Sequence, residues 1–79
     1  GVQPATEPVL FQEENGLLIL ESATTGASIA YQANDAIGGK HWELYTGPIP
    51  APEIDKIKAV AIRIGYRESD PRRYALKGK

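Results

Sequence analysis

The chain alternates short apolar runs with clusters of turn-forming residues, and this pattern predicts β-strands with little helix. The clearest alternation lies in residues 27–33, where side chains at every second position share one face of a strand. One face carries Ala27, Ile29, Tyr31 and Ala33, and the other carries Ser28, Ala30 and Gln32. Such a segment is typical of a strand with one face turned to a core.

Six strands are predicted in this way, at residues 9–12, 17–21, 27–33, 41–45, 56–64 and 72–76. Turn signals such as Asn15-Gly16 and Gly38-Gly39 separate them, at the spacing of about 8–12 residues that is typical of small all-β domains. β-Branched residues are dense in 54–64, which disfavours helix there. We therefore expect an all-β fold, an antiparallel β-sandwich of six to seven strands.

The length of 79 residues indicates one domain. Residues 1–8 hold two prolines and few apolar positions, so we interpret them as a linker or disordered arm and residues 9–79 as a single sandwich domain. The sequence contains no methionine, which we interpret as the mark of a fragment cut from a longer protein.

The segment 41–52 joins a predicted strand to a rigid loop. Alternation places Trp42 and Leu44 on one face of the strand and His41, Glu43 and Tyr45 on the other. We interpret the face with Leu44 as the one turned to the core. Glycine and three prolines then fill residues 47–52, and we expect this loop to end the strand and carry the chain between sheets.

The predicted strand at 56–64 carries apolar residues on both faces. One face carries Ile57, Ala59, Ala61 and Arg63, and the other carries Lys58, Val60, Ile62 and Ile64. Two interpretations stay open. Ala59 and Ala61 point outward, where alanine is harmless, or part of this strand forms an apolar patch that packs against another domain.

Composition excludes several classes of function. The net charge is −1 and no basic cluster is visible beyond the pair Arg72-Arg73, which argues against binding to nucleic acid. The absence of cysteine excludes disulfides and cysteine-based metal sites. No apolar run approaches the ~18 residues that a membrane span needs.

Residues suited to catalysis are few. His41 is the only histidine, which leaves no second imidazole for a metal site, and we interpret it as a surface residue of a strand. Carboxylates that could pair as acid and base stand at Asp35, Glu43, Glu53 and Asp55, but no catalytic motif joins them. We therefore expect no cofactor in this domain, no metal site and no enzymatic activity of the chain by itself.

Aromatic residues are the remaining candidates for a binding site. Trp42, Tyr45 and Tyr31 could form a strip on which sugar rings stack. Alternatively, these large side chains supply the burial that a small sandwich needs, at about 1.5–3 kcal/mol for each one that is fully buried. Both interpretations stay open.

Three segments resemble a known module when they are taken in order: GASIAYQ (26–32), LYTGPIP (44–50) and KIKAVAIRIGYRES (56–69). They are similar to the chitobiase/beta-hexosaminidase C-terminal type domain, also called fibronectin type III-associated, over about residues 16–70. The motif positions are Ile29, Tyr31, Tyr45 to Ile49, Ile57 to Ala59, Ala61, Gly65 and Ser69. The family's TxDGxxP loop is absent, because residues 32–39 read QANDAIGG.

The variant with a Gly-Lys-x-Trp segment before LYTGP resembles the C-terminal end of bacterial sulfatases. This resemblance implies an immunoglobulin/fibronectin III-like sandwich that serves as a non-catalytic accessory domain of a larger hydrolase, a periplasmic or extracellular sulfatase acting on glycans. The implied partner is the catalytic domain of the same polypeptide, with a glycan as a second partner. The sulfatase nucleophile motif, Cys/Ser-x-Pro-x-Arg, is absent, so no catalytic residue carries over. The alternative function is a carbohydrate-binding module that uses Trp42, Tyr45 and Tyr31.

Overall fold

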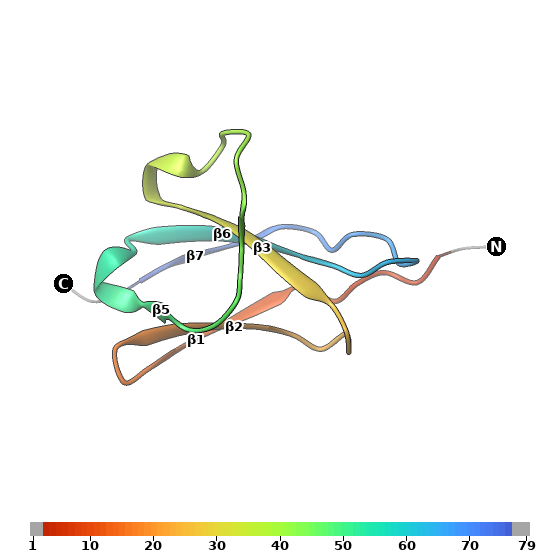
Figure 1. Ribbon diagram of the computed structural model, residues 1–79, viewed down its shortest axis with the longest axis horizontal. Coiled ribbons are helices and arrows are strands. Elements are labelled where there is room, and N and C mark those ends of the chain that lie inside the picture. The colour runs from red at the N-terminus through yellow and green to blue at the C-terminus, as the bar shows by residue number, and fades with distance from the viewer. Residues whose placement is uncertain (1–2, 77–79) are drawn as a thin grey trace.

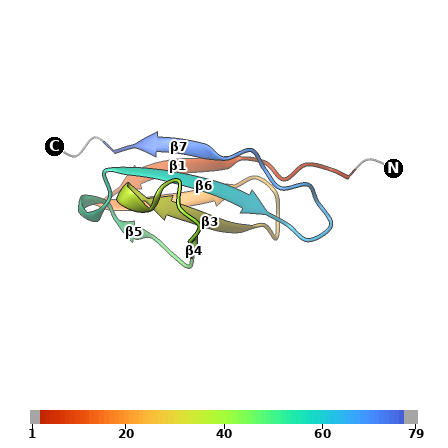
Figure 2. The same ribbon diagram turned by 90° about the horizontal axis from the view of Figure 1, so that it is seen from above.

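The computed structural model describes residues 3–76, which form two antiparallel β-sheets packed face to face (Figures 1 and 2). One sheet has the order β1-β2-β5, with β1 at Val9–Glu14, β2 at Leu17–Ser22 and β5 at Ile49–Pro50. The other has the order β4-β3-β6-β7, with β4 at Glu43–Leu44, β3 at Ser28–Ala33, β6 at Lys56–Ile62 and β7 at Arg72–Ala75. These strands confirm the predicted all-β sandwich.

The short strand β5 was not predicted, because it lies in the proline loop. It pairs with β2 through Leu17↔Pro50 and Leu18↔Ile49. Proline is tolerated there since β5 is an edge strand, where a missing N–H leaves no neighbour unpaired. Two single turns of 3₁₀ helix, η1 at Asn34–Ala36 and η2 at Ala51–Glu53, complete the described elements.

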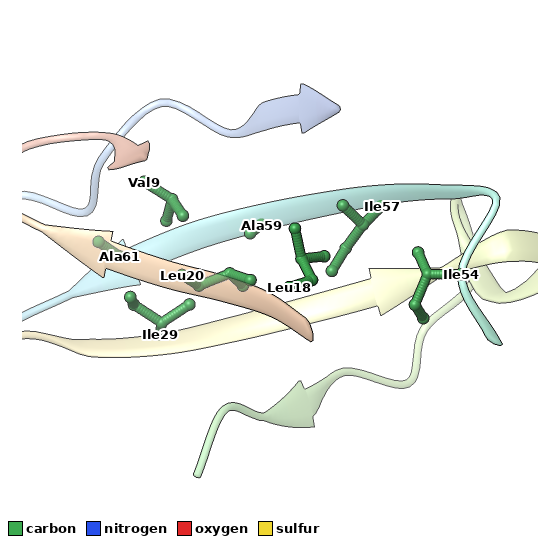
Figure 3. Packing of buried hydrophobic residues seen from close by; sticks show 8 residues of the cluster. All are labelled: Val9, Leu18, Leu20, Ile29, Ile54, Ile57, Ala59 and Ala61. Atoms are coloured by element: carbon green, nitrogen blue, oxygen red, sulfur yellow. The ribbon is translucent and has the colours of Figure 1, made fainter. Parts of the chain in front are cut away.

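The core lies between the sheets and takes inward residues from β1, β2, β3 and β6, together with Ile54 just before β6 (Figure 3). Its buried members are Val9, Leu18, Leu20, Ile29, Ile54, Ile57, Ala59 and Ala61. Ala59 and Ala61 on β6 are fully buried, so the interpretation that these alanines point outward is wrong. Each pairs with an inward residue of β3, Tyr31 and Ile29 respectively, which fixes the orientation of β6.

The predicted faces of the segment 41–45 are also reversed. Leu44 pairs with Ala30 on the side of the sheet away from the core, and 63% of its surface is exposed. Tyr45 instead packs against the core, and its hydroxyl accepts a hydrogen bond from the backbone N–H of Leu20 at 3.3 Å. The regular strand ends at Leu44, and the backbone N–H of Tyr45 bonds to the carbonyl of Ile29.

Two polar side chains fix the connections around β6. Asn34, in the left-handed conformation at φ 54°, accepts hydrogen bonds at Oδ1 from the N–H groups of Asp55 and Lys56 and donates one to the carbonyl of Glu53. At the other end of β6, buried Ser69 accepts at Oγ from the N–H of Ala61 at 2.8 Å. Both side chains satisfy backbone groups that regular pairing leaves free.

An aromatic pair links the edges of the two sheets. The ring of Phe11 on β1 stacks on Tyr74 of β7, with 5.2 Å between centroids, and the Tyr74 hydroxyl donates to the Glu13 carboxylate. This hydrogen bond, together with burial and the carboxylate charge, raises the pKa of Tyr74. The pair therefore holds β1 against β7 at the open side of the sandwich.

The described part of the expected N-terminal arm is hydrogen-bonded to the domain. Thr6 is buried, its N–H donates to the carbonyl of Arg67, and the N–H of Arg67 donates to the carbonyl of Pro4. Glu7 bonds through its N–H to Thr24 Oγ1 at 2.8 Å. Of the segment 1–8 expected to be a linker or disordered arm, residues 1–2 lie outside the described residues.

The two faces of β6 can be tested with the same substitution on each. We expect Ala59→Asp to prevent folding, because an unpaired buried charge costs several kcal/mol and a small domain has only about 5–15 kcal/mol of stability in total. Ile62→Asp, on the opposite face and 40% exposed, should change the free energy of unfolding far less. Urea denaturation followed by circular dichroism measures both, and equal losses would contradict the assignment of faces.

Candidate binding face of the four-stranded sheet

The side of the four-stranded sheet that faces away from the core carries most of the residues suited to binding. Strand register assigns them: Ala30 pairs with Leu44 and Val60, Gln32 pairs with Lys58, and Lys58 pairs with Arg73. Together with Lys56 and Ile62, which share the same face of β6, these residues are called the outer face below. Figure 1 shows the loop between β3 and β4 rising on this side, away from β1 and β2.

Gln32 lies on the outer face but is only 1% exposed, because the loop 37–41 covers it. Its Nε2 donates hydrogen bonds to the carbonyls of Gly39 at 2.9 Å and His41 at 3.0 Å. Its Oε1 accepts from the N–H of Gly38 at 3.1 Å, where φ is +92° and favours glycine. The buried amide therefore anchors the loop that leads directly into Trp42.

Trp42 lies next to this anchor, is 36% exposed and borders a groove on the outer face. The Nζ atom of Lys58 lies 5.8 Å from the centroid of its ring. This contact follows from register, because Lys58 is directly opposite the Gln32 that holds the loop. The groove has a volume of about 360 Å³ and is lined by Ala30, Trp42, Lys58, Val60, Ile62, Glu68 and Pro71.

Three cations gather on the same face. Lys58 and Arg73 are directly opposite each other on β6 and β7, and Lys56 follows two residues away on β6. Lys56 and Arg73 also line a second groove of about 330 Å³. Like charges at opposite positions of a sheet destabilise it. Within residues 3–76 the one ion pair is His41–Glu43, so no described carboxylate forms a direct ion pair with these three cations.

The structure does not bring the three expected aromatic residues onto one surface. Tyr31 and Tyr45 pack against the core, whereas Trp42 lies on the outer face. Burial, followed by the charge of Glu43, raises the pKa of Tyr31. Only Trp42 of the expected set is available to a ligand on the outer face.

Lys58 and Arg73 were missed as site residues. The sequence contained one usable signal, the cations at positions 56 and 58, which alternation places on one face of a strand. Arg73 joins them only through the pairing of β6 with β7, and neighbouring Arg72 pairs with Ala59 on the core side. Register of this kind cannot be read from local pattern.

His41 lies at the surface, as expected from the sequence. Its Nε2 is 2.7 Å from Oε2 of Glu43, and the two side chains are 79% and 59% exposed. Within residues 3–76, no group of three or more His, Cys, Asp or Glu side chains converges in a way that could hold a metal ion. The His41–Glu43 pair is thus a solvated contact at the sheet edge.

The chain is similar in sequence to a short part of one known sulfatase. The chain is 32% identical over 71 residues to an ulvan-active sulfatase of Formosa agariphila, and the matched region covers 87% of this chain and 12% of the relative. The chain thus spans only 12% of the length of that curated protein. It matches no model of a known protein family, and no solved structure matches it. Among residues 3–76 there is no helix long and apolar enough to cross a membrane.

The Gln32 anchor predicts a coupled effect on stability and on the environment of Trp42. We expect Gln32→Leu to lower the free energy of unfolding, because each loop group left buried without a partner costs about 1–3 kcal/mol. The loop should loosen and the emission of Trp42, the only tryptophan, should shift to longer wavelength. Gln12→Leu, at an exposed position of β1, is the matched control. Unchanged emission and stability in Gln32→Leu would contradict the anchor.

Proposed function

We propose that this chain is a non-catalytic accessory domain of a larger sulfatase-type polypeptide that acts on glycans outside the cytoplasm. The observation that carries the proposal is the similarity to a stretch that makes up 12% of an ulvan-active sulfatase. In that relative, the matched stretch is joined to a much longer sequence, which supports a role beside a catalytic domain. The resemblance of residues 26–32, 44–50 and 56–69 to the C-terminal end of bacterial sulfatases also supports an accessory role.

The geometry of the described residues supports a binding role over a catalytic one. Catalysis requires titratable groups that converge in a cleft shielded from water. Here His41 and Glu43 lie in solvent at the edge of the sheet, while the outer face presents an aromatic ring, aliphatic side chains and cations. The catalytic domain of the same polypeptide is the partner that the proposal implies.

A carbohydrate-binding module is the second candidate function. One observation favours it: Trp42 is half-exposed on the outer face, beside Lys58 and above a groove. The two functions are compatible, because an accessory domain that holds a glycan serves a glycan-processing enzyme by raising the local concentration of its substrate.

The proposal that this chain belongs to a larger sulfatase can be tested by reading the gene that encodes it. We expect the same reading frame to encode a sulfatase catalytic domain with the Cys/Ser-x-Pro-x-Arg nucleophile motif and a signal for export. Sequencing the surrounding gene settles the matter. A frame that encodes this domain beside an unrelated catalytic domain, or with no catalytic domain at all, would contradict the proposal.

The proposed absence of catalysis can be measured on the chain itself. We expect no hydrolysis of a chromogenic aryl sulfate or of a chromogenic glycoside above a buffer blank, because no shielded nucleophile or acid–base pair is present among the described residues. His41→Ala is expected to give the same trace as the unmodified chain. Turnover that disappears in His41→Ala would show that this histidine is catalytic.

A further inference from the structure

We propose that the outer face of the four-stranded sheet binds an anionic saccharide, a sugar chain that carries sulfate esters or carboxylates. Trp42 would contact the sugar ring, and Lys58, Arg73 and Lys56 would contact the anionic groups. This inference rests on the proposed accessory function, which explains why an anionic sugar would be the ligand. Binding itself can be tested on the chain alone.

The aromatic contact depends on the position of Trp42. A flat indole ring offers an apolar surface on which the C–H face of a sugar can stack, while its N–H can bond to a hydroxyl. Trp42 is 36% exposed, and its groove has an aliphatic floor that includes Ala30 and Val60. A sugar ring on Trp42 would therefore extend over the groove and toward β6.

The cations supply the charge complementarity. Lys58 and Arg73 lie directly opposite each other on β6 and β7, with the Lys58 ammonium near the ring of Trp42 and Arg73 beside Lys56 in the second groove. An extended chain with several anionic groups would contact the two cations in turn as it crosses from the Trp42 groove to the second groove. Lys56 continues the row along β6 and offers a contact to a second anionic group.

Glu68 distinguishes a sugar from a simple polyanion. Its carboxylate lines the same groove as Trp42 and Lys58 and can accept hydrogen bonds from sugar hydroxyls. A bare polyanion would instead be repelled by this carboxylate. The mixture of an aromatic ring, cations and one acceptor matches a molecule that has apolar ring faces, anionic groups and hydroxyls together.

The Gln32 anchor makes the site largely preformed. Three hydrogen bonds from one buried amide hold the loop 37–41, so Trp42 needs little ordering when a ligand binds. Reduced ordering leaves more of the contact energy for affinity.

A protein partner could also cover the exposed side chains of Leu44 and Ile62, but it would have to neutralise three clustered cations when it removed them from water.

The test uses fluorescence of Trp42, which reports on the site without a label because the chain has one tryptophan. Four probes are titrated: dextran sulfate, carboxymethyl dextran, unmodified dextran and polyglutamate. We expect the two anionic dextrans to change the emission and to bind more tightly than the other two probes. Tighter binding of dextran sulfate would identify sulfate as the preferred group, and tighter binding of carboxymethyl dextran would identify carboxylate.

Variants of adjacent arginines provide a matched control. Arg73→Ala and Lys58→Ala should each weaken binding about threefold or more, since each removes one charged contact. Arg72→Ala removes the same charge from the next position, which pairs on the core side, and should leave affinity within about twofold. Trp42→Ala should bind dextran sulfate about tenfold more weakly or worse, while its melting temperature changes little. Because this variant has no tryptophan, its affinity is measured by electrophoresis through gels that contain dextran sulfate.

Three outcomes would overturn the proposal. Polyglutamate binding as tightly as the anionic dextrans, with Arg72→Ala as harmful as Arg73→Ala, would indicate nonspecific charge attraction. Absence of binding by both anionic dextrans would exclude the site. If Ile62→Asp destabilises the full polypeptide while no saccharide binds, the outer face is a protein interface. A gene without a sulfatase would remove the proposed parent but leave the binding result standing, so the two failures are distinguishable.

Discussion

Burial of the inward face of β6 is the constraint on which the rest of the structure depends. Its inward positions, Ile57, Ala59 and Ala61, are fully buried and bring the four-stranded sheet against β1 and β2. Once that face is committed to the core, Lys58, Val60 and Ile62 must point outward. The groove and its cation therefore result from the same alternation that builds the core. A change of register by one residue would exchange the two faces.

Much of the fold could be predicted from sequence, but the direction of each face could not. The alternation of 27–33 is strong enough to identify β3 and to separate its two faces, and the structure shows that the face with Ile29 is the inward one. Along β6 and in the segment 41–45 both faces carry apolar residues, so local pattern gave no preference and Leu44 was assigned to the core in place of Tyr45. The candidate site was predicted only at Trp42. Lys58, Arg73 and the anchor Gln32 converge through strand pairing between distant segments.

The motif residues that suggested a family have structural explanations in this fold. Ala59 and Ala61 face the core, Gly65 turns the chain at φ +85°, and Ser69 bonds to the backbone of Ala61. Tyr45 bonds to Leu20 across the sheets. These positions have roles within the sandwich itself, so no ligand is needed to explain them. Specificity would reside in residues outside the motif, such as Trp42 and Arg73, which lie on the outer face.

The four-stranded sheet turns one face to the core, and its outer face is the functional surface that we propose. The most direct measurement is a titration of the ¹⁵N-labelled chain with a short dextran sulfate oligosaccharide, followed by NMR chemical shifts. We expect the shifts to concentrate at the Trp42 indole and at the amides of Lys58 and Arg73, and to be small along β1 and β2. Shifts spread over both sheets, or centred on β1 and β2, would contradict the account.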